Sequence, residues 1–402
     1  MKKITQIILL AFLTLAFIGG IRQWRVAHWY KKAGELYEKN LFEDALFSAQ
    51  KASRLDPKNP EKKRLLAKIY LELVAGRNIQ TQLNILRKAE KELIDATSIE
   101  PLYPYYWAEL GRVEELIERL GEQPARSPSS CFHRAVVIDP NNPLFVEMFF
   151  RYLVQKGSCS SAQNLLKRQL ELEPKSALEL AKLWLVNNCG YDALIQLLSS
   201  NPKFLSGLAL WMVTRKEFKE LAEKTAYKAH LQSPEDKKLA FNYGWILAEM
   251  SKCAQAKKVL EKFFNEPEWK KPALEEYGLC LFRTHKWQEA EKIYLELISI
   301  TPEQVNYRWE LARIYLALKD YEKAKQQLIW LSERADSSLR KKAWLALGKI
   351  YEKENNRIKA IQAYESYLKL NPKDQKIKNK LKKLKPAFEE IIYSPWRIKN
   401  EK

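Results

Sequence analysis

The sequence predicts an all-α fold built as an array of stacked helical hairpins. Apolar and small residues recur at helical spacing on both sides of short turns, and the same set of positions returns further along the chain. Only 12 glycines occur, with no run of alternating valine, isoleucine and threonine, and this composition argues against a sheet. With 402 residues and 46% hydrophobic content, a hairpin array can bury a large core.

Residues 277–302 show one such hairpin. Positions with helical spacing lie on both sides of Lys286, which marks the turn. Gly278 and Ala290 have almost no side chain, so we expect the two helix backbones to approach closely there. Pro302 ends the second helix because it lacks an N–H group and disfavours helical geometry in the residue before it.

The hairpin recurs along the chain. Stepping 34 residues back from Gly278 reaches Gly244, 34 forward reaches Ala312, and a further 36 reaches Gly348. The alanines equivalent to Ala290 are Ala256, Ala324 and Ala360. A single hairpin cannot bury its apolar face, so a repeat of this length indicates units that stack on one another.

These positions resemble the tetratricopeptide repeat (TPR) family, whose units combine W-x2-L-G-x2-Y, A-x3-F and a closing proline. The unit with the full pattern carries Trp344, Leu347, Gly348, Tyr351, Ala360, Tyr364 and Pro372. The resemblance covers about residues 27 to 373. It implies a right-handed α-solenoid of about ten TPR-like helical hairpins. Together with the N-terminal apolar run described below, from which we expect one transmembrane helix before the array, the chain resembles a membrane-anchored bacterial TPR protein.

The units differ in regularity along the chain. We expect a membrane anchor over residues 1–26, an irregular TPR-like array over 27–235, a regular array over 236–373, and a capping helix with a basic tail over 374–402. The second unit, which closes at Pro101, has a turn about ten residues longer than the family period allows.

The N-terminal segment differs in kind from the repeats. After Lys2 and Lys3, the run ITQIILLAFLTLAFIGGI has no charge over 18 residues, which is just long enough to cross a bilayer as a helix. A cleaved signal peptide is the alternative, but the run lacks a good small-x-small cleavage site. We expect a single-pass protein of the inner membrane. We place the repeats, with a slight preference, on the extracytoplasmic side. The balance of positive residues on the two sides of the apolar run, taken alone, favours a cytoplasmic location for the repeats.

Residues that could support chemistry are scattered. The cysteines, Cys131, Cys159, Cys189, Cys253 and Cys280, form no C-x-x-C pair, so we interpret them as small packing residues in a reducing or oxygen-poor setting. The four histidines form no metal-spaced pair, and no phosphate-binding or nucleophile motif occurs. The sequence predicts no enzyme, no metal and no cofactor.

The resemblance assigns partner binding to a concave groove lined by the first helices of successive hairpins. The groove positions are Phe241, Asn242, Trp245, Glu276, Leu279, Arg283, Trp309, Glu310, Arg313, Leu345, Lys349 and Lys353. Aromatic rings beside arginine and asparagine suit a protein or peptide partner. Tryptophans at such positions also bridge neighbouring repeats, so packing between repeats is the alternative for Trp245 and Trp309.

The net charge of +20 permits acidic partners, anionic lipid or nucleic acid. Groove positions mix glutamate with arginine, whereas a nucleic-acid solenoid shows a basic stripe at one repeat position. We therefore expect a non-catalytic scaffold that binds a protein partner, without a small-molecule substrate, in assembly of an envelope complex such as secretion, pilus, polysaccharide export or cytochrome maturation. A nucleic-acid-binding or regulatory protein is the alternative.

Overall fold

The computed structural model describes the backbone of residues 2–385 and the side chains of residues 13, 14 and 16–385. Within these residues the chain is helical and contains no strand, as the sequence predicts. It divides into two compact units, Met1–Ser200 and Asn201–Lys402. The part of the predicted basic tail over 386–402 lies outside the described residues.

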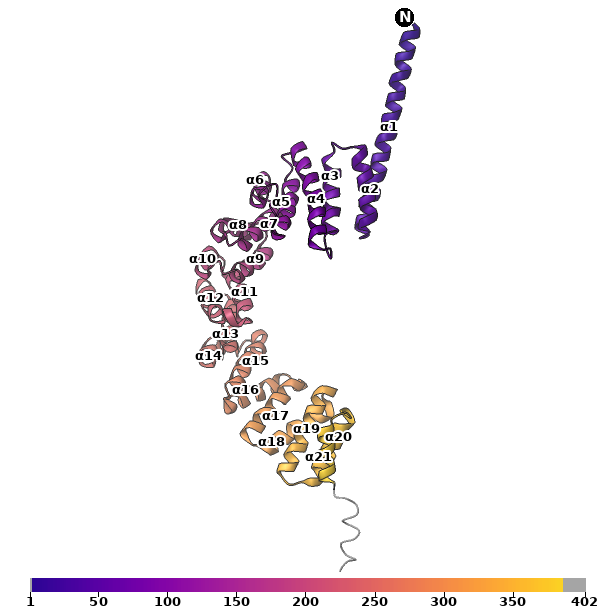
Figure 1. Cartoon of the computed structure of the whole chain (residues 1–402). Helices are drawn as coiled ribbons and strands as arrows, with labels where there is room; N and C mark the ends of the chain where they lie inside the picture. Colours follow the sequence, from indigo (N-terminus) through magenta and orange to yellow (C-terminus); the bar gives the residue numbers. More distant parts are fainter. Residues whose placement is uncertain (1, 386–402) are drawn as a thin grey trace, which may run out of the picture. The chain divides into compact units, whose positions relative to one another are not determined.

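Unit 1 consists of five successive helical pairs (Figure 1). Its helices are α1 Lys2–Glu38, α2 Phe42–Leu55, α3 Pro60–Glu72, α4 Ile79–Ile99, α5 Pro104–Arg119, α6 Pro128–Ile138, α7 Pro143–Gln155, α8 Cys159–Leu172, α9 Pro174–Val186 and α10 Tyr191–Leu197. The second repeat exceeds the family period mainly because helix α4 is 21 residues long. The prediction that the extra residues all lie in the turn was therefore wrong.

Unit 2 continues the pattern with five pairs and a closing helix. Its α-helices are α11 Pro202–Val213, α12 Lys219–Gln232, α13 Lys237–Glu249, α14 Cys253–Leu260, α15 Pro267–Arg283, α16 Trp287–Ile300, α17 Val305–Leu318, α18 Tyr321–Arg334, α19 Ser337–Lys353, α20 Arg357–Leu370 and α21 Gln375–Leu384. Two 3-10 turns, η1 Lys216–Phe218 and η2 Glu261–Phe263, adjoin α12 and α14.

Small residues set the close approach of the two helices in a pair, as predicted. A Cβ atom added to Gly278 would lie 3.0 Å from Cγ2 of Ile293, and one added to Gly244 would lie 2.6 Å from Leu260. Ala290 is fully buried. The first helices α11, α13 and α15 also contact one another, so each hairpin packs on the next.

The N-terminal helix α1 is continuous and also forms the first half of the first hairpin. Arg22 binds the Leu55 carbonyl through Nε and Nη2, at 2.8 and 2.7 Å, and so ties α1 to the end of α2. Further toward the N-terminus α1 extends beyond α2 (Figure 1). The helix therefore continues without a break through residue 26, where the predicted anchor ends.

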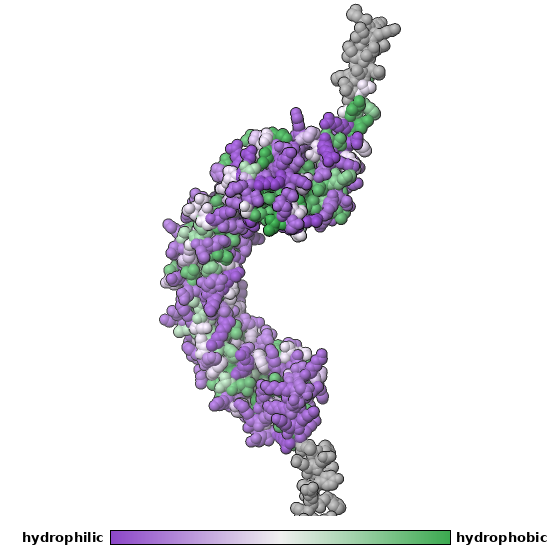
Figure 2. Space-filling model, viewed as in Figure 1, coloured by the Kyte–Doolittle hydropathy of each residue, from purple (hydrophilic) through white to green (hydrophobic). Residues whose placement is uncertain are grey.

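No helix among the described residues is long and apolar enough to cross a membrane. The structure thus does not support the transmembrane helix that the sequence predicts. Most side chains of the apolar run over residues 4–21 lie outside the described set. Its described part carries exposed apolar side chains, including Phe17 at 70% and Ile18 at 61% exposure, and Figure 2 shows green residues next to the grey end of α1.

Two disulfides correct the prediction that the cysteines are all packing residues. Cys159 pairs with Cys189, and Cys253 pairs with Cys280, with Cα–Cα distances of 5.3 and 5.7 Å. Each joins the first residue of a second helix to the C-terminal end of the next first helix or the loop after it. Cys131 is free and buried, as expected of a packing residue.

Candidate partner-binding groove

The predicted groove positions fall on α13, α15, α17 and α19, the first helices of four successive hairpins in unit 2. An Asp side chain caps the start of two of these helices, Asp236 before α13 and Asp336 before α19. The closing helix α21 packs Ile377, Leu381 and Leu384 against the cluster that contains Tyr364. Helix α21 therefore covers the hairpin formed by α19 and α20.

Two of the predicted residues on α13 serve contacts within the protein. The Phe241 ring packs against Phe263 and Trp269, with ring centroids 6.0 and 5.2 Å away. Asn242 donates a hydrogen bond to the Ser206 hydroxyl at 2.8 Å. These side chains link neighbouring hairpins, so the structure does not bring them into a binding pocket.

A pocket of about 360 Å³ lies between α15 and α17, and we name it the acidic pocket. Its lining residues are Glu275, Glu276, Leu279, Tyr294, Leu297, Gln304, Asn306, Tyr307 and Glu310. Of the predicted site, Glu276, Leu279 and Glu310 lie here. The pKa of Glu276 is raised to about 7: burial is the largest cause, the charge of Glu249 acts in the same direction, and Arg283 and the Trp245 indole oppose the shift.

The other glutamates of the acidic pocket have partners. Glu275 accepts a hydrogen bond from the Tyr307 hydroxyl. Glu310 forms an ion pair with Arg313 at 2.8 Å, and burial nevertheless raises the pKa of Glu310. The Arg313 guanidinium lies 4.4 Å from the Phe282 ring centroid, while Arg283 pairs with Glu249 at 2.9 Å. Arg283 and Arg313, both predicted for the groove, therefore already contact neighbouring side chains of the protein.

A second pocket, of about 350 Å³, lies between α17 and α19, and we name it the lysine-rimmed pocket. Its lining residues are Trp309, Leu316, Tyr321, Lys342, Leu345, Ala346, Lys349, Ile350 and Lys353. Trp309, Leu345, Lys349 and Lys353 were predicted for the groove. Lys342 was not, although it lies one helical turn before Leu345 and Ala346 and could have been found by that spacing.

The two pockets adjoin opposite sides of α17, so the groove offers neighbouring sites of different charge. Among the described residues no group of three or more His, Cys, Asp or Glu side chains could hold a metal ion. The described groove is therefore a surface of aromatic, aliphatic and charged side chains. Such a surface can bind a polypeptide segment by apolar anchoring and hydrogen bonding.

Comparison with known proteins identifies the repeats. The model of the family described as tetratricopeptide repeat matches residues 305–328 and 341–374, which correspond to parts of α17 to α20. Human protein O-mannosyl-transferase TMTC1 is 28% identical over 123 residues, which are 28% of this chain and 14% of that protein. Cellulose synthase operon protein C of Salmonella typhimurium is 37% identical over 79 residues, 19% of this chain and 7% of that protein.

The chain thus spans 14% or less of the length of either curated relative. Among solved structures, a thermophilic TPR protein of Thermus thermophilus is 18% identical, with a TM-score of 0.32; the alignment covers 55% of this chain and 98% of that one. The family match thus identifies the hairpins of α17 to α20 as tetratricopeptide repeats, and the other helical pairs of both units have the same hairpin arrangement.

Proposed function

We propose that the protein is a non-catalytic scaffold that binds a protein partner through the groove formed by α13, α15, α17 and α19. The observation that carries this proposal is the succession of the acidic and lysine-rimmed pockets along neighbouring first helices. Arrays of tetratricopeptide repeats expose such helices to polypeptide ligands, and tryptophan and arginine often dominate the binding energy of interfaces.

The finer function proposed is assembly of an envelope complex at a membrane. The exposed apolar side chains of α1 support membrane association, and the two disulfides support an oxidising, extracytoplasmic compartment. Among the four systems proposed, polysaccharide export is the first to examine because one partial relative is named for a cellulose synthase operon.

Affinity capture from detergent-solubilised membranes tests the groove. Trp245→Ala and Trp309→Ala each remove one groove ring, and we expect each to reduce recovery of the partner by tenfold or so while the circular dichroism spectrum is retained. The control variant replaces Lys378, Lys382 and Lys383 of α21 with glutamine, and we expect it to capture normally. Loss of capture only in the α21 variant would instead indicate a charge-driven polyanion ligand, nucleic acid included.

A further inference from the structure

The lysine-rimmed pocket combines an apolar floor with a basic edge. Trp309 and Leu316 of α17 and Leu345, Ala346 and Ile350 of α19 form the floor, with Tyr321 at one end. Lys342, Lys349 and Lys353 are exposed and stand on one side, spaced along α19. Spacings of seven and four residues place their ammonium groups on the same face of the helix.

These three lysines make no ion pair with any carboxylate of the described residues. The Lys342 Nζ atom lies 5.9 Å from the Trp309 ring centroid, and the Lys353 Nζ atom donates to the Tyr321 hydroxyl at 3.2 Å. Lysines of the adjacent helices behave differently, since Lys325 pairs with Glu354 at 2.8 Å and Lys380 with Glu352 at 2.6 Å. Lys342 acts on the carboxylates of Glu310 and Asp336 only at longer range, so the pocket edge keeps ammonium groups that are not in ion-pair contact with a carboxylate.

We propose that the lysine-rimmed pocket binds an acidic segment of a protein, with one apolar side chain on the floor and neighbouring carboxylates on Lys342, Lys349 and Lys353. This inference rests on the proposed function and names the chemistry of the partner. A cluster of ammonium groups beside an apolar floor is complementary to an apolar residue flanked by aspartate or glutamate.

The acidic pocket on the other side of α17 supplies the selectivity. Glu275, Glu276 and Glu310 face that pocket, so a segment rich in carboxylates is disfavoured there. The same segment is attracted to the lysine-rimmed pocket between α17 and α19. Because the three ammonium groups are exposed, their attraction is screened by salt, whereas contact with the Trp309 floor is not.

The probe is a fluorescein-labelled peptide with a phenylalanine flanked on both sides by glutamates, and binding to the full chain is measured by fluorescence anisotropy. Two matched peptides separate the contributions, one with glutamine in place of glutamate and one with alanine in place of phenylalanine. We expect the first peptide to bind about tenfold or more tightly than either control peptide, with an affinity that falls as salt is raised.

Three variants locate the binding. Lys349→Glu with Lys353→Glu reverses two edge charges, and we expect it to weaken the acidic peptide by about tenfold or more. Lys378→Glu with Lys382→Glu makes the same change of charge on α21 and should leave binding unchanged. Ala346→Phe fills the floor without altering charge and should also weaken binding, with thermal unfolding used to check that each variant folds.

Three results would overturn the inference: no binding of the acidic peptide, equal binding of its glutamine counterpart, or unchanged binding in Lys349→Glu with Lys353→Glu. The proposed function is judged separately by capture of the cellular partner with Trp245→Ala and Trp309→Ala. If capture depends on those rings while the acidic peptide fails to bind, the groove is a binding surface and the lysine-rimmed pocket has a different ligand.

Discussion

Glu276 shows how the groove alters the chemistry of a single carboxyl group. It sits on α15 between the Trp245 indole, Arg283, and the carboxylates of Glu249 and Glu275. Burial is the largest influence and raises its pKa to about 7, with Glu249 and Glu275 acting in the same direction. Arg283 offsets part of this effect, but it also pairs with Glu249. A fraction of Glu276 is therefore protonated at neutral pH.

The raised pKa predicts a stability change between pH 4.5 and about 7. In this window the unfolded state has lost the proton that the folded state retains, so the folded state binds more protons. The free energy of unfolding therefore falls as the pH rises. Urea unfolding measured across this range should show a smaller decline for Glu276→Gln than for the wild type, with Glu303→Gln, an exposed position, as the control. Equal slopes in wild type and Glu276→Gln would contradict the assignment.

At the residue scale the sequence could assign positions to the groove but not their partners. Family spacing placed Trp309 and Lys349 on the first helices, and the structure brings both into one pocket. The same spacing included Asn242, which instead binds Ser206 of α11. That contact depends on how far one hairpin is displaced from the next, and this displacement has no signature within a single repeat.

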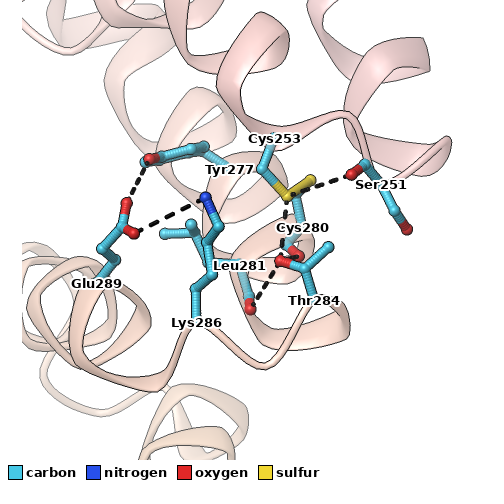
Figure 3. The surroundings of a disulfide bond; sticks show 8 residues. All are labelled: Ser251, Cys253, Tyr277, Cys280, Leu281, Thr284, Lys286 and Glu289. Atoms are coloured by element: carbon cyan, nitrogen blue, oxygen red, sulfur yellow. Dashed lines mark hydrogen bonds and ion pairs between the residues drawn. A yellow bond between two sulfur atoms is a disulfide. The ribbon is translucent and has the colours of Figure 1, made fainter.

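At the element scale the disulfides act as links between successive hairpins. Figure 3 shows Cys253 at the start of α14 beside Cys280 on α15, with the Thr284 hydroxyl 3.4 Å from the Cys253 sulfur. Close by, Lys286 and Tyr277 both contact Glu289 of α16, at 3.9 and 3.3 Å. The cysteines are 27 residues apart in sequence and come together only because the hairpins stack. A search for C-x-x-C spacing could not detect them.

Removing this link should destabilise unit 2. Cys253→Ser with Cys280→Ser opens a loop of 27 residues, and the chain-entropy model gives a loss of about 3 to 4 kcal/mol. Hydrogen exchange should show faster exchange in α14 and α15 for this variant and for the wild type in reductant. Reductant should produce no further change in those two helices of the variant. Free thiols at both positions in the purified, unreduced protein would contradict the pairing.

The turns inside the hairpins share a second structural device. A residue other than glycine with positive φ follows the first helix in six of the pairs; these residues are Asn40, Asn188, Ser251, His285, Lys319 and Asn355. Asparagine tolerates this conformation, whereas the steric cost of positive φ is higher for serine, histidine and lysine. Each such residue turns the chain so that the second helix folds back on the first.

Lys319→Gly should therefore stabilise the pair α17 and α18. Lys319 has a φ of 60°, where glycine avoids a steric cost of about 1 kcal/mol, partly offset by the greater freedom of glycine in the unfolded chain. Lys319→Ala removes the same side chain without removing the Cβ atom and is the matched control. The denaturation midpoint should rise for the glycine variant only. A glycine variant no more stable than the alanine variant would show that the turn carries no strain.

At the scale of the whole molecule, the repeat period was sufficient to predict an all-α array. Small residues such as Gly244 and Gly278 mark close helix contacts, and their recurrence at about 34 residues indicates that the same kind of unit repeats. The period could not predict that α1 runs unbroken from the apolar segment into the first hairpin. No proline occurs over residues 22–38, so the sequence there contains no residue that would end the helix between the apolar segment and the first hairpin.

The location of the molecule is the remaining prediction at this scale. The described part of α1 exposes Leu13, Phe17 and Ile18, and uncovered apolar side chains in such a cluster favour contact with a membrane. We expect the full chain to sediment with membranes and to resist carbonate extraction. Replacing these three residues with glutamine should move much of the protein into the soluble fraction.

The matched control for this experiment replaces three equally exposed apolar residues of the repeats, Ile79, Leu102 and Val137, with glutamine. It removes a comparable amount of apolar surface, so its retention on the membrane would localise the effect to α1. Mature protein that begins after residue 21 and is released by carbonate would show instead that the apolar segment is a cleaved signal. In that case the repeats would act without an anchor, while the disulfides would still favour an oxidising compartment.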